Sequence, residues 1–211
     1  MTEAASVTTL VMGEQLPWTD DASAGDGNGP FESGVIHAGG SRLQCSILKI
    51  SALGAMVGGR IAKPAGTEVT VELAAGQRPA GTIDWVRGGE AGIRFKQPID
   101  ILALINRTLV SQPVERRTMP RVEIRCRAHL KFGATFSPAL LRNISAGGLQ
   151  LEGDALPPVG TYVAVFLKGL NIPAGEVSWR KDDLAGIELF DELSWSSIMP
   201  WIRDMVRRGV N

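Results

Sequence analysis

Three arginines and a short polar turn are the residues of this chain whose types and spacing could bind an anionic ligand. Arg117 and Arg121 are four residues apart, and Arg116 directly precedes them. Pro120 disfavours a helix here, because the residue before a proline is pushed toward extended geometry. In an extended chain, four residues span about 13 Å and place both side chains on one face. That reach suits two groups of one elongated anion, although a solvated basic linker would have the same sequence.

The polar turn has the pattern Asn143-x-Ser145-x-x-Gly148, and it begins 22 residues after Arg121. Arginine supplies a planar fork that can contact phosphate, or the O6/N7 edge of guanine, with two hydrogen bonds. The short side chains of Asn143 and Ser145 can hydrogen-bond a base edge, and the adjacent glycines allow close backbone approach and positive φ. Ordinary turn chemistry uses the same residue types, so the turn alone leaves both interpretations open.

Taken together, the arginine pair and the polar turn resemble the two-part signature of PilZ domains. The later pattern Gly175-x-Val177-x-Trp179 and residues 185–190 are similar to strands of the same family. The resemblance covers roughly residues 115–207. It implies a six-stranded β-barrel with a C-terminal helix, and a regulatory receptor for cyclic di-GMP that is not an enzyme and carries no cofactor.

The resemblance also implies which side chains contact the ligand. The arginine pair would grip guanine and phosphate, the asparagine and serine would contact a guanine base, and the glycine would hold the turn. The extra arginine before the motif could help to hold a stacked ligand dimer, or it could be solvated. The expected ligand-binding residues are therefore Arg116, Arg117, Arg121, Asn143, Ser145 and Gly148.

The chain also repeats itself, since residues 45–95 match residues 139–189 at an offset of 94 residues without a gap. Short strands separated by glycine and proline turns are typical of a barrel or sandwich. We therefore expect an all-β fold with two PilZ-like six-stranded β-barrels in tandem, each followed by a C-terminal helix, at Ile99–Val110 and Leu193–Val206. Strands are expected at 45–50, 55–57, 69–73, 81–86 and 92–95, and at 122–132, 149–152, 162–167, 175–180 and 185–190.

Charge and composition set the expected boundaries. Residues 1–41 hold six acidic residues and no lysine or arginine, whereas the rest of the chain is net +6. A segment rich in glycine and polar residues cannot bury enough apolar surface to offset the entropy of ordering. In chain order, we expect a flexible acidic tail at 1–33, a degenerate PilZ-like barrel with its helix at 34–111, a linker carrying the arginine motif at 112–121, and a PilZ barrel with its helix at 122–211.

The first copy departs from the motif. The positions 94 residues before the arginine pair are Ser23 and Gly27, and Lys49 stands at the place of the asparagine. Ser51 and Gly54 keep the serine and glycine, so that part of the motif is expected to be partly architectural. We therefore expect the first barrel not to bind the dinucleotide and to have a structural, dimerising or partner-binding role.

Composition narrows the class of protein further. The chain is 44% hydrophobic and 21% charged, and it has no apolar run near the roughly 20 residues of a membrane span. We expect a cytoplasmic protein without a membrane span. Cys45 and Cys126 have no metal-binding spacing and are expected to be reduced thiols. His37 and His129 lie in no catalytic spacing, which disfavours an enzyme.

Two other functions stay open at this point. A PilZ-like interaction adaptor that binds no nucleotide would use its barrels as docking surfaces, with a downstream protein partner on the first barrel and a homodimer as a further arrangement. Polynucleotide binding through the arginine cluster together with Arg125, Arg127 and Lys131 is disfavoured, because Phe132 is the one aromatic stacking platform in that stretch. The downstream process, the number of ligands per site and the oligomeric state do not follow from the sequence.

Overall fold

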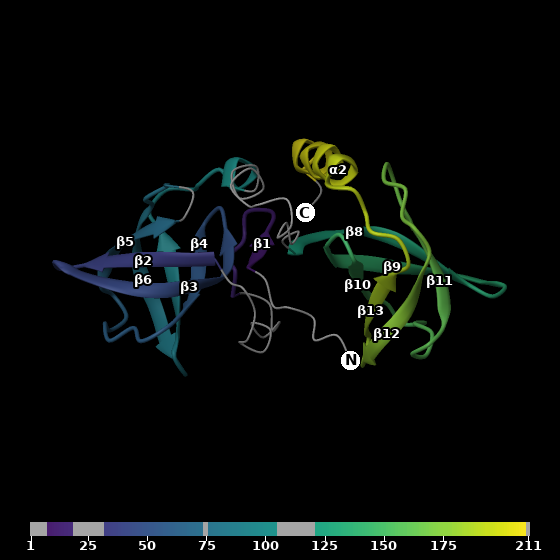
Figure 1. Ribbon diagram of the computed structural model, residues 1–211, viewed down its shortest axis with the longest axis horizontal. Coiled ribbons are helices and arrows are strands. Elements are labelled where there is room, and N and C mark those ends of the chain that lie inside the picture. The colour runs from purple at the N-terminus through teal and green to yellow at the C-terminus, as the bar shows by residue number, and fades with distance from the viewer. Residues whose placement is uncertain (1–7, 19–31, 74–75, 105–120, 210–211) are drawn as a thin grey trace. The chain divides into compact units, whose positions relative to one another are not determined.

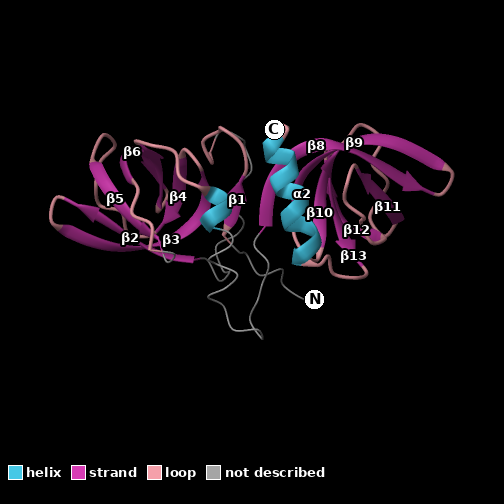
Figure 2. Cartoon of the chain, turned by 90° about the horizontal axis from the view of Figure 1, so that it is seen from above, coloured by secondary structure: helices cyan, strands magenta, loops and turns pink. Residues whose placement is uncertain are grey.

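The computed structural model describes residues 8–18, 32–73, 76–104 and 121–209 (Figure 1). The chain divides into two compact units, Met1–Pro120 and Arg121–Asn211. Strands dominate both of them, and the second unit ends in a long helix (Figure 2). The predicted all-β class, with a closed six-stranded antiparallel barrel and a C-terminal helix, is confirmed.

In the first unit, the antiparallel pairings run from β2 through β3, β4, β7, β6 and β5 and return to β2. Six strands therefore form a closed ring. A seventh strand, β1, lies outside this ring and pairs in parallel with β3. The bounds are β1 Thr9–Val11, β2 Glu32–Ala38, β3 Ser41–Ser51, β4 Gly54–Gly58, β5 Glu68–Leu73, β6 Ala80–Arg87 and β7 Glu90–Phe95.

In the second unit, the pairings run from β8 through β9, β10, β13, β12 and β11 and return to β8. This order repeats that of the first ring. Helix α2 follows the last strand. The bounds are β8 Arg121–Phe132, β9 Thr135–Ile144, β10 Gly148–Glu152, β11 Tyr162–Leu167, β12 Gly175–Lys181, β13 Leu184–Leu189 and α2 Trp195–Arg207.

The strands form where apolar residues alternate with polar ones, because successive side chains of a strand point to opposite faces. In β11, Val163, Val165 and Leu167 are buried, while the residues between them are half-buried or exposed. Burying one such side chain stabilises a fold by about 1.5–3 kcal/mol. The largest fully buried side chains of both rings are branched and apolar. They are Ile36, Ile47, Ile50, Ile83 and Ile93 in the first ring, and Leu130, Leu141, Ile144, Leu151 and Ile187 in the second.

The 94-residue offset holds for backbone hydrogen bonds as well as for residue types. Turn and loop bonds recur between equivalent atoms of the two units at nearly equal lengths. Gly66 N to Ile83 O (2.7 Å) corresponds to Gly160 N to Val177 O (2.8 Å). Phe95 N to Leu53 O (2.8 Å) corresponds to Leu189 N to Gly147 O (2.9 Å). Gly59 N to Gly89 O corresponds to Gly153 N to Asp183 O, both at 2.9 Å. The repeated sequence positions therefore build the same turns.

The expectation of a flexible tail over 1–33 is wrong for residues 8–18 and for residues 32–33, which begin strand β2. Thr9, Leu10 and Val11 form strand β1, and the segment after it continues to Trp18. The apolar, β-branched run of residues 7–12 favours a strand. The strand was not predicted because the longer polar segment after it dominates the composition of residues 1–33. Residues 1–7 and 19–31 lie outside the described part. The same holds for most of the expected linker at 112–121, whose last residue, Arg121, begins β8.

Of the predicted helix at Ile99–Val110, residues 99–104 are described, and the helix begins at Ile101, two residues after the expected start. There the backbone N–H of Ala103 donates to Oδ1 of Asp100 at 3.0 Å, which satisfies one free donor of a first helical turn. Ile101 and Leu104 are buried. Among the described residues, no helix is both long and apolar enough to cross a membrane.

Helix α2 begins at Trp195, two residues after the expected start, and contains Pro200 inside its span. Pro200 has no N–H and therefore cannot donate to the preceding turn. Trp201 is buried, and its indole N–H donates to the carbonyl oxygen of Lys168 at 2.9 Å. This bond anchors α2 to the loop that follows β11, which leaves the Trp201 indole unavailable to a dimer interface.

Candidate functional site

A row of residues crosses four strands on the outward face of the second ring. Strand pairing sets Asn143 of β9 opposite Gln150 of β10, Gln150 opposite Gly186 of β13, and Gly186 opposite Trp179 of β12. Both strand neighbours of Gln150 are buried leucines, so Gln150 faces away from the core. We call Asn143, Gln150, Gly186 and Trp179 the polar row.

At one end of the polar row, Nδ2 of Asn143 donates a hydrogen bond to Oε1 of Gln150. The β9–β10 register shifts next to this pair, between Gln150 and Leu151. Such a bulge adds a residue to one strand and re-aims the neighbouring side chains. The added residue is Arg142, which forms an ion pair with Glu152. The Asn143 side chain is therefore held in a defined place, with 8% of the residue exposed.

At the other end, Trp179 packs directly on Gly186. A Cβ atom at Gly186 would lie 2.0 Å from Nε1 of Trp179, so this position has no room for a larger residue. Trp179 nevertheless remains 42% exposed. An exposed aromatic ring offers a π-face on which a nucleobase can stack. The first ring has the same arrangement, since a Cβ at Gly92 would lie 2.2 Å from Nε1 of Trp85.

The turn before β10 is held by its own residues. Ser145 donates to the carbonyl oxygen of Gly148 through its backbone N–H at 2.9 Å and through its hydroxyl at 3.3 Å. A Cβ atom at Gly148 would lie 2.6 Å from the carbonyl oxygen of Ile187. Positive φ, which the sequence suggested for the two turn glycines, is found at neither Gly147 nor Gly148. Glycine is required at Gly148 for space.

The predicted arginines are described in part. Arg121 is exposed and begins β8. The next residue, Val122, pairs with Ile144, so Arg121 lies beside the strand end that leads into Ser145. Arg121 and the polar turn therefore come together at one end of the ring. Arg116 and Arg117 lie outside the described residues. The ligand-contact role of all six predicted residues stays a prediction.

Two side chains of this surface, those of Gln150 and Trp179, were not among those expected from the sequence to bind the ligand, and neither was Gly186. Gln150 escaped notice because its place beside Asn143 depends on strand register. Trp179 was not singled out as a contact residue, because both copies have a tryptophan at this position. The sequence repeat could have pointed to Gln150, because the equivalent residue of the first copy, 94 positions earlier, is the apolar Met56. A polar residue on an outward strand face, replaced by an apolar one in the other copy, marks a position that the ring itself does not require.

The equivalent row of the first ring has different chemistry. Pairing sets Lys49 opposite Met56, Met56 opposite Gly92, and Gly92 opposite Trp85. Met56 takes the place of Gln150 and is 6% exposed. The glycine and tryptophan are kept, whereas the amide pair is lost.

Residues 8–18 cover this first row. Strand β1 pairs with residues 49–51 of β3, and the Thr8 hydroxyl donates to the carbonyl oxygen of Ile47 at 2.7 Å. Trp18 meets Trp85 edge to face, with ring centroids 6.0 Å apart. A Cβ atom at Gly54 would lie 3.3 Å from both Leu16 and Trp18. The chain itself therefore occupies the surface that corresponds to the polar row.

Trp179 is the exposed member of the polar row, whereas Asn143 and Gly186 are buried and Gln150 is half-buried. A hollow of about 500 Å³ lies between the first turn of α2 and residues 169–173. No group of three or more His, Cys, Asp or Glu side chains in the described part of the chain could hold a metal ion. Cys45 and Cys126 are free and buried, and burial raises the pKa of each thiol to about 11.

Comparison with known proteins gives no match to a protein-family model and no match to a curated protein. Several solved structures are similar at low identity. PlzA of Borreliella burgdorferi in complex with c-di-GMP is 12% identical, with a TM-score of 0.32 over 86% of this chain and 88% of that one. The inhibitor of motility MotI/DgrA of Bacillus subtilis is 15% identical, with a TM-score of 0.32 over 85% and 97%. YcgR of Escherichia coli in complex with c-di-GMP is 12% identical, with a TM-score of 0.28 over 84% and 83%. Likeness at these scores assigns no ligand to this chain.

Proposed function

We propose that this protein is a receptor for cyclic di-GMP, that it binds the ligand on the second ring, and that it is not an enzyme. The observation that carries the proposal is the contrast between the two rings. They share the residues that build the turns, such as Gly148 and Gly54 with their close backbone contacts. They differ where side chains face outward, at Asn143 and Gln150 against Lys49 and Met56.

The chemistry of the polar row fits a guanine base. Guanine offers the O6 and N7 acceptors on one edge and the N2 amino donor on another. The Arg121 guanidinium can donate two parallel hydrogen bonds to O6 and N7. The side-chain amides of Asn143 and Gln150 carry both donors and acceptors for the remaining polar atoms. Trp179 supplies a face for the base to stack on, and such stacking contributes about 1–3 kcal/mol per base.

Arg116 and Arg117 extend this proposal to the phosphates. They precede Arg121 in the chain that joins the two units. An arginine fork matches a phosphate with charge-assisted hydrogen bonds. Contact of these arginines with a ligand seated on the second ring would fix the path of the joining chain. We propose that cyclic di-GMP acts in this way, by changing how the two units are arranged.

We further propose that the two units are tandem PilZ-like domains, of which the first is degenerate. The recurrence of turn bonds at the 94-residue offset supports a common design. The cover formed by residues 8–18 supports a first ring that takes no dinucleotide. The chain would therefore have one ligand site.

The alternative is a PilZ-like interaction adaptor that binds no nucleotide. One observation favours it, namely the large exposed aromatic side chains on strands of the second ring, such as Phe136 and Phe166. A receptor can have such a surface as well, so the two functions are separated by direct titration of the ligand.

Isothermal titration calorimetry with cyclic di-GMP tests the proposal. Arg121→Ala and Arg117→Ala should each weaken binding about ten- to a hundredfold, since a hydrogen bond to a charged group contributes about 1.5–3 kcal/mol. Arg87→Ala is the matched control, because Arg87 is an exposed arginine at the end of β6 in the first ring. Wild-type affinity in both Arg121→Ala and Arg117→Ala, as in the Arg87→Ala control, would contradict the assigned site.

A further inference from the structure

A second outward surface of the second ring lies on strands β9, β8 and β11. Strand pairing sets Lys131 opposite Phe136, and His129 between Pro138 and Phe166. Arg127 is the next outward residue of β8. We call these six residues, Arg127, His129, Lys131, Phe136, Pro138 and Phe166, the aromatic face.

The aromatic face is continuous and exposed. The rings of His129 and Phe136 stack with centroids 5.0 Å apart and an angle of 12° between their planes. Phe136 also contacts Phe166, at a centroid distance of 5.7 Å. Phe136 is nevertheless 59% exposed and Phe166 49% exposed. Contiguous exposed apolar surface of this kind marks interaction sites in soluble proteins.

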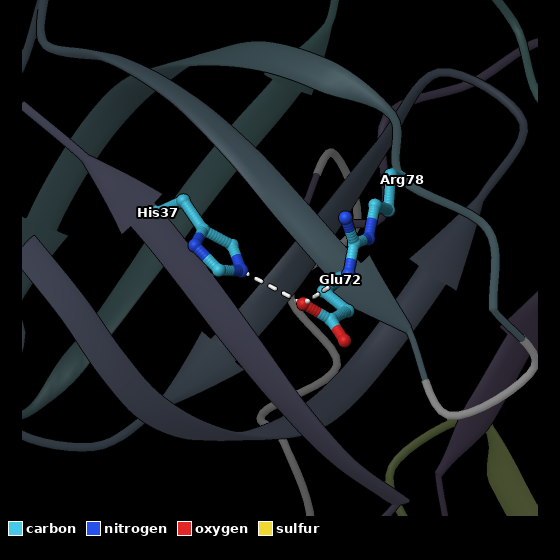
Figure 3. A network of polar contacts seen from close by, with 3 residues as sticks. All are labelled: His37, Glu72 and Arg78. Atoms are coloured by element: carbon cyan, nitrogen blue, oxygen red, sulfur yellow. Dashed lines mark hydrogen bonds and ion pairs between the residues drawn. The ribbon is translucent and has the colours of Figure 1, made fainter. Parts of the chain in front are cut away.

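The first ring shows that the fold does not require aromatic residues here. The residues 94 positions before Phe136 and Phe166 are Arg42 and Glu72. Glu72 Oε2 lies 2.8 Å from Nε2 of His37 and 3.2 Å from a guanidinium nitrogen of Arg78 (Figure 3). These polar partners hold the pKa of the Glu72 carboxyl below its usual value, with the hydrogen bond from His37 as the largest cause.

A second pair of positions repeats the contrast. Tyr162 and Phe190 of the second unit stack at a centroid distance of 4.6 Å. The equivalent residues of the first unit, Glu68 and Lys96, form an ion pair at 2.5 Å. The same places in the ring therefore hold charged partners in one copy and aromatic partners in the other.

The charge of the aromatic face points to the chemistry of its partner. Lys131 and Arg127 are both exposed on the β8 side of the face, and the carboxylates near the face, those of Glu152, Asp154 and Asp183, line a hollow at its Pro138 end. A complementary partner therefore carries acidic groups, placed to meet the β8 cations while apolar groups cover the phenyl rings. A polynucleotide is disfavoured, because residues 121–211 hold 11 basic and 10 acidic residues, a net charge of +1, where nucleic-acid-binding domains are strongly basic.

We propose that the aromatic face docks an acidic peptide segment of a protein partner, in which aliphatic or aromatic side chains alternate with carboxylates. The apolar side chains of the peptide cover Phe136 and Phe166, and its carboxylates meet Lys131 and Arg127. This surface does not include the residues of the polar row. Loss of peptide binding and loss of cyclic di-GMP binding are therefore separate outcomes.

Fluorescence anisotropy with the full chain tests the proposal. The probe is a fluorescein-labelled peptide of alternating glutamate and leucine, and the comparison probes are its lysine–leucine counterpart and a labelled oligothymidylate. The acidic peptide should bind best. Phe136→Ser combined with Phe166→Ser should weaken that binding about tenfold or more, and Lys131→Glu should weaken it as well.

Val86→Ser is the control, since Val86 is an exposed apolar residue of the first ring, 40% exposed. The altered side chains are exposed, so the circular dichroism spectrum should stay that of the wild type, and the unfolding midpoint should fall slightly because two ring contacts are lost. Equal acidic-peptide binding by the wild type and the double phenylalanine variant would overturn the proposal, as would no binding by the wild type. Tighter binding of the lysine peptide or of oligothymidylate would also overturn it. The proposal would also be overturned if sedimentation showed that the wild type alone forms a dimer and that the double phenylalanine variant does not.

Discussion

The side-chain amide of Asn143 donates to the side-chain oxygen of Gln150 across strands β9 and β10. In the first ring, Lys49 and Met56 hold the same two positions in the same register. The two rings otherwise share turn bonds and the glycine–tryptophan contact. The amide pair is thus an addition to a common design. On the β8 side of the pair, Glu123 lies opposite Asn143, two residues after Arg121.

Trp179→Ala should weaken cyclic di-GMP binding by about one order of magnitude, since stacking on an aromatic side chain contributes about 1–3 kcal/mol per base. Ligand binding to the wild type should change the tryptophan fluorescence, and Trp179→Ala should lose most of that change. Trp85→Ala, the equivalent change in the first ring, should leave the ligand affinity as it is. Equal affinity losses in the two variants would show that the effect is not local to the polar row.

Gly148→Ala should destabilise the second unit by about 1–3 kcal/mol, because the new methyl group would lie 2.6 Å from the Ile187 carbonyl oxygen. Gly147→Ala is a matched control, since a Cβ atom there meets no heavy atom within 4 Å and its φ is not positive. Urea denaturation of both variants measures the difference. Equal stability of the two would argue that Gly148 is kept for ligand contact and not for space.

Trp18→Ala should loosen the cover of the first ring. The edge-to-face contact with Trp85 contributes about 0.5–1.5 kcal/mol beyond the area that it buries, so the unfolding midpoint should fall. Cyclic di-GMP should still bind with the wild-type stoichiometry, because the uncovered row presents Lys49 and Met56. A second equivalent of bound ligand in calorimetry would mean that the cover alone had blocked a working site.

The two thiols should react slowly in the folded protein. Burial raises the pKa of Cys45 and Cys126 to about 11, so both stay protonated near pH 8. Their folded pKa values lie above the ordinary thiol value of 9.0, so the unfolded chain loses its thiol protons at a lower pH than the folded chain does. The free energy of unfolding should therefore fall as the pH rises from about 9 toward 11. Alkylation by iodoacetamide, followed by mass spectrometry, should be slow until urea is added. Rapid labelling of the folded chain at pH 8 would contradict the burial.

Much of the fold follows from the sequence because the repeat marks its architectural residues. The strand expected at 162–167 has the observed bounds, and those at 149–152 and 175–180 differ by one residue at one end. Strand β1 was missed, since three strand residues beside a long polar stretch give too short an alternation. Gln150 was missed because its neighbour Asn143 is set by a bulged register, which residue spacing alone does not reveal.

The central claim is that the polar row of the second ring binds cyclic di-GMP. The most direct test is calorimetric titration of the wild type and of a variant that combines Asn143→Lys with Gln150→Met, which gives the second ring the amide-free chemistry of the first. The wild type should bind at one site, and the folded double variant should lose at least about two orders of magnitude in affinity, as expected for two lost hydrogen-bonding groups. Wild-type affinity in the double variant, or no binding by the wild type, would contradict the claim.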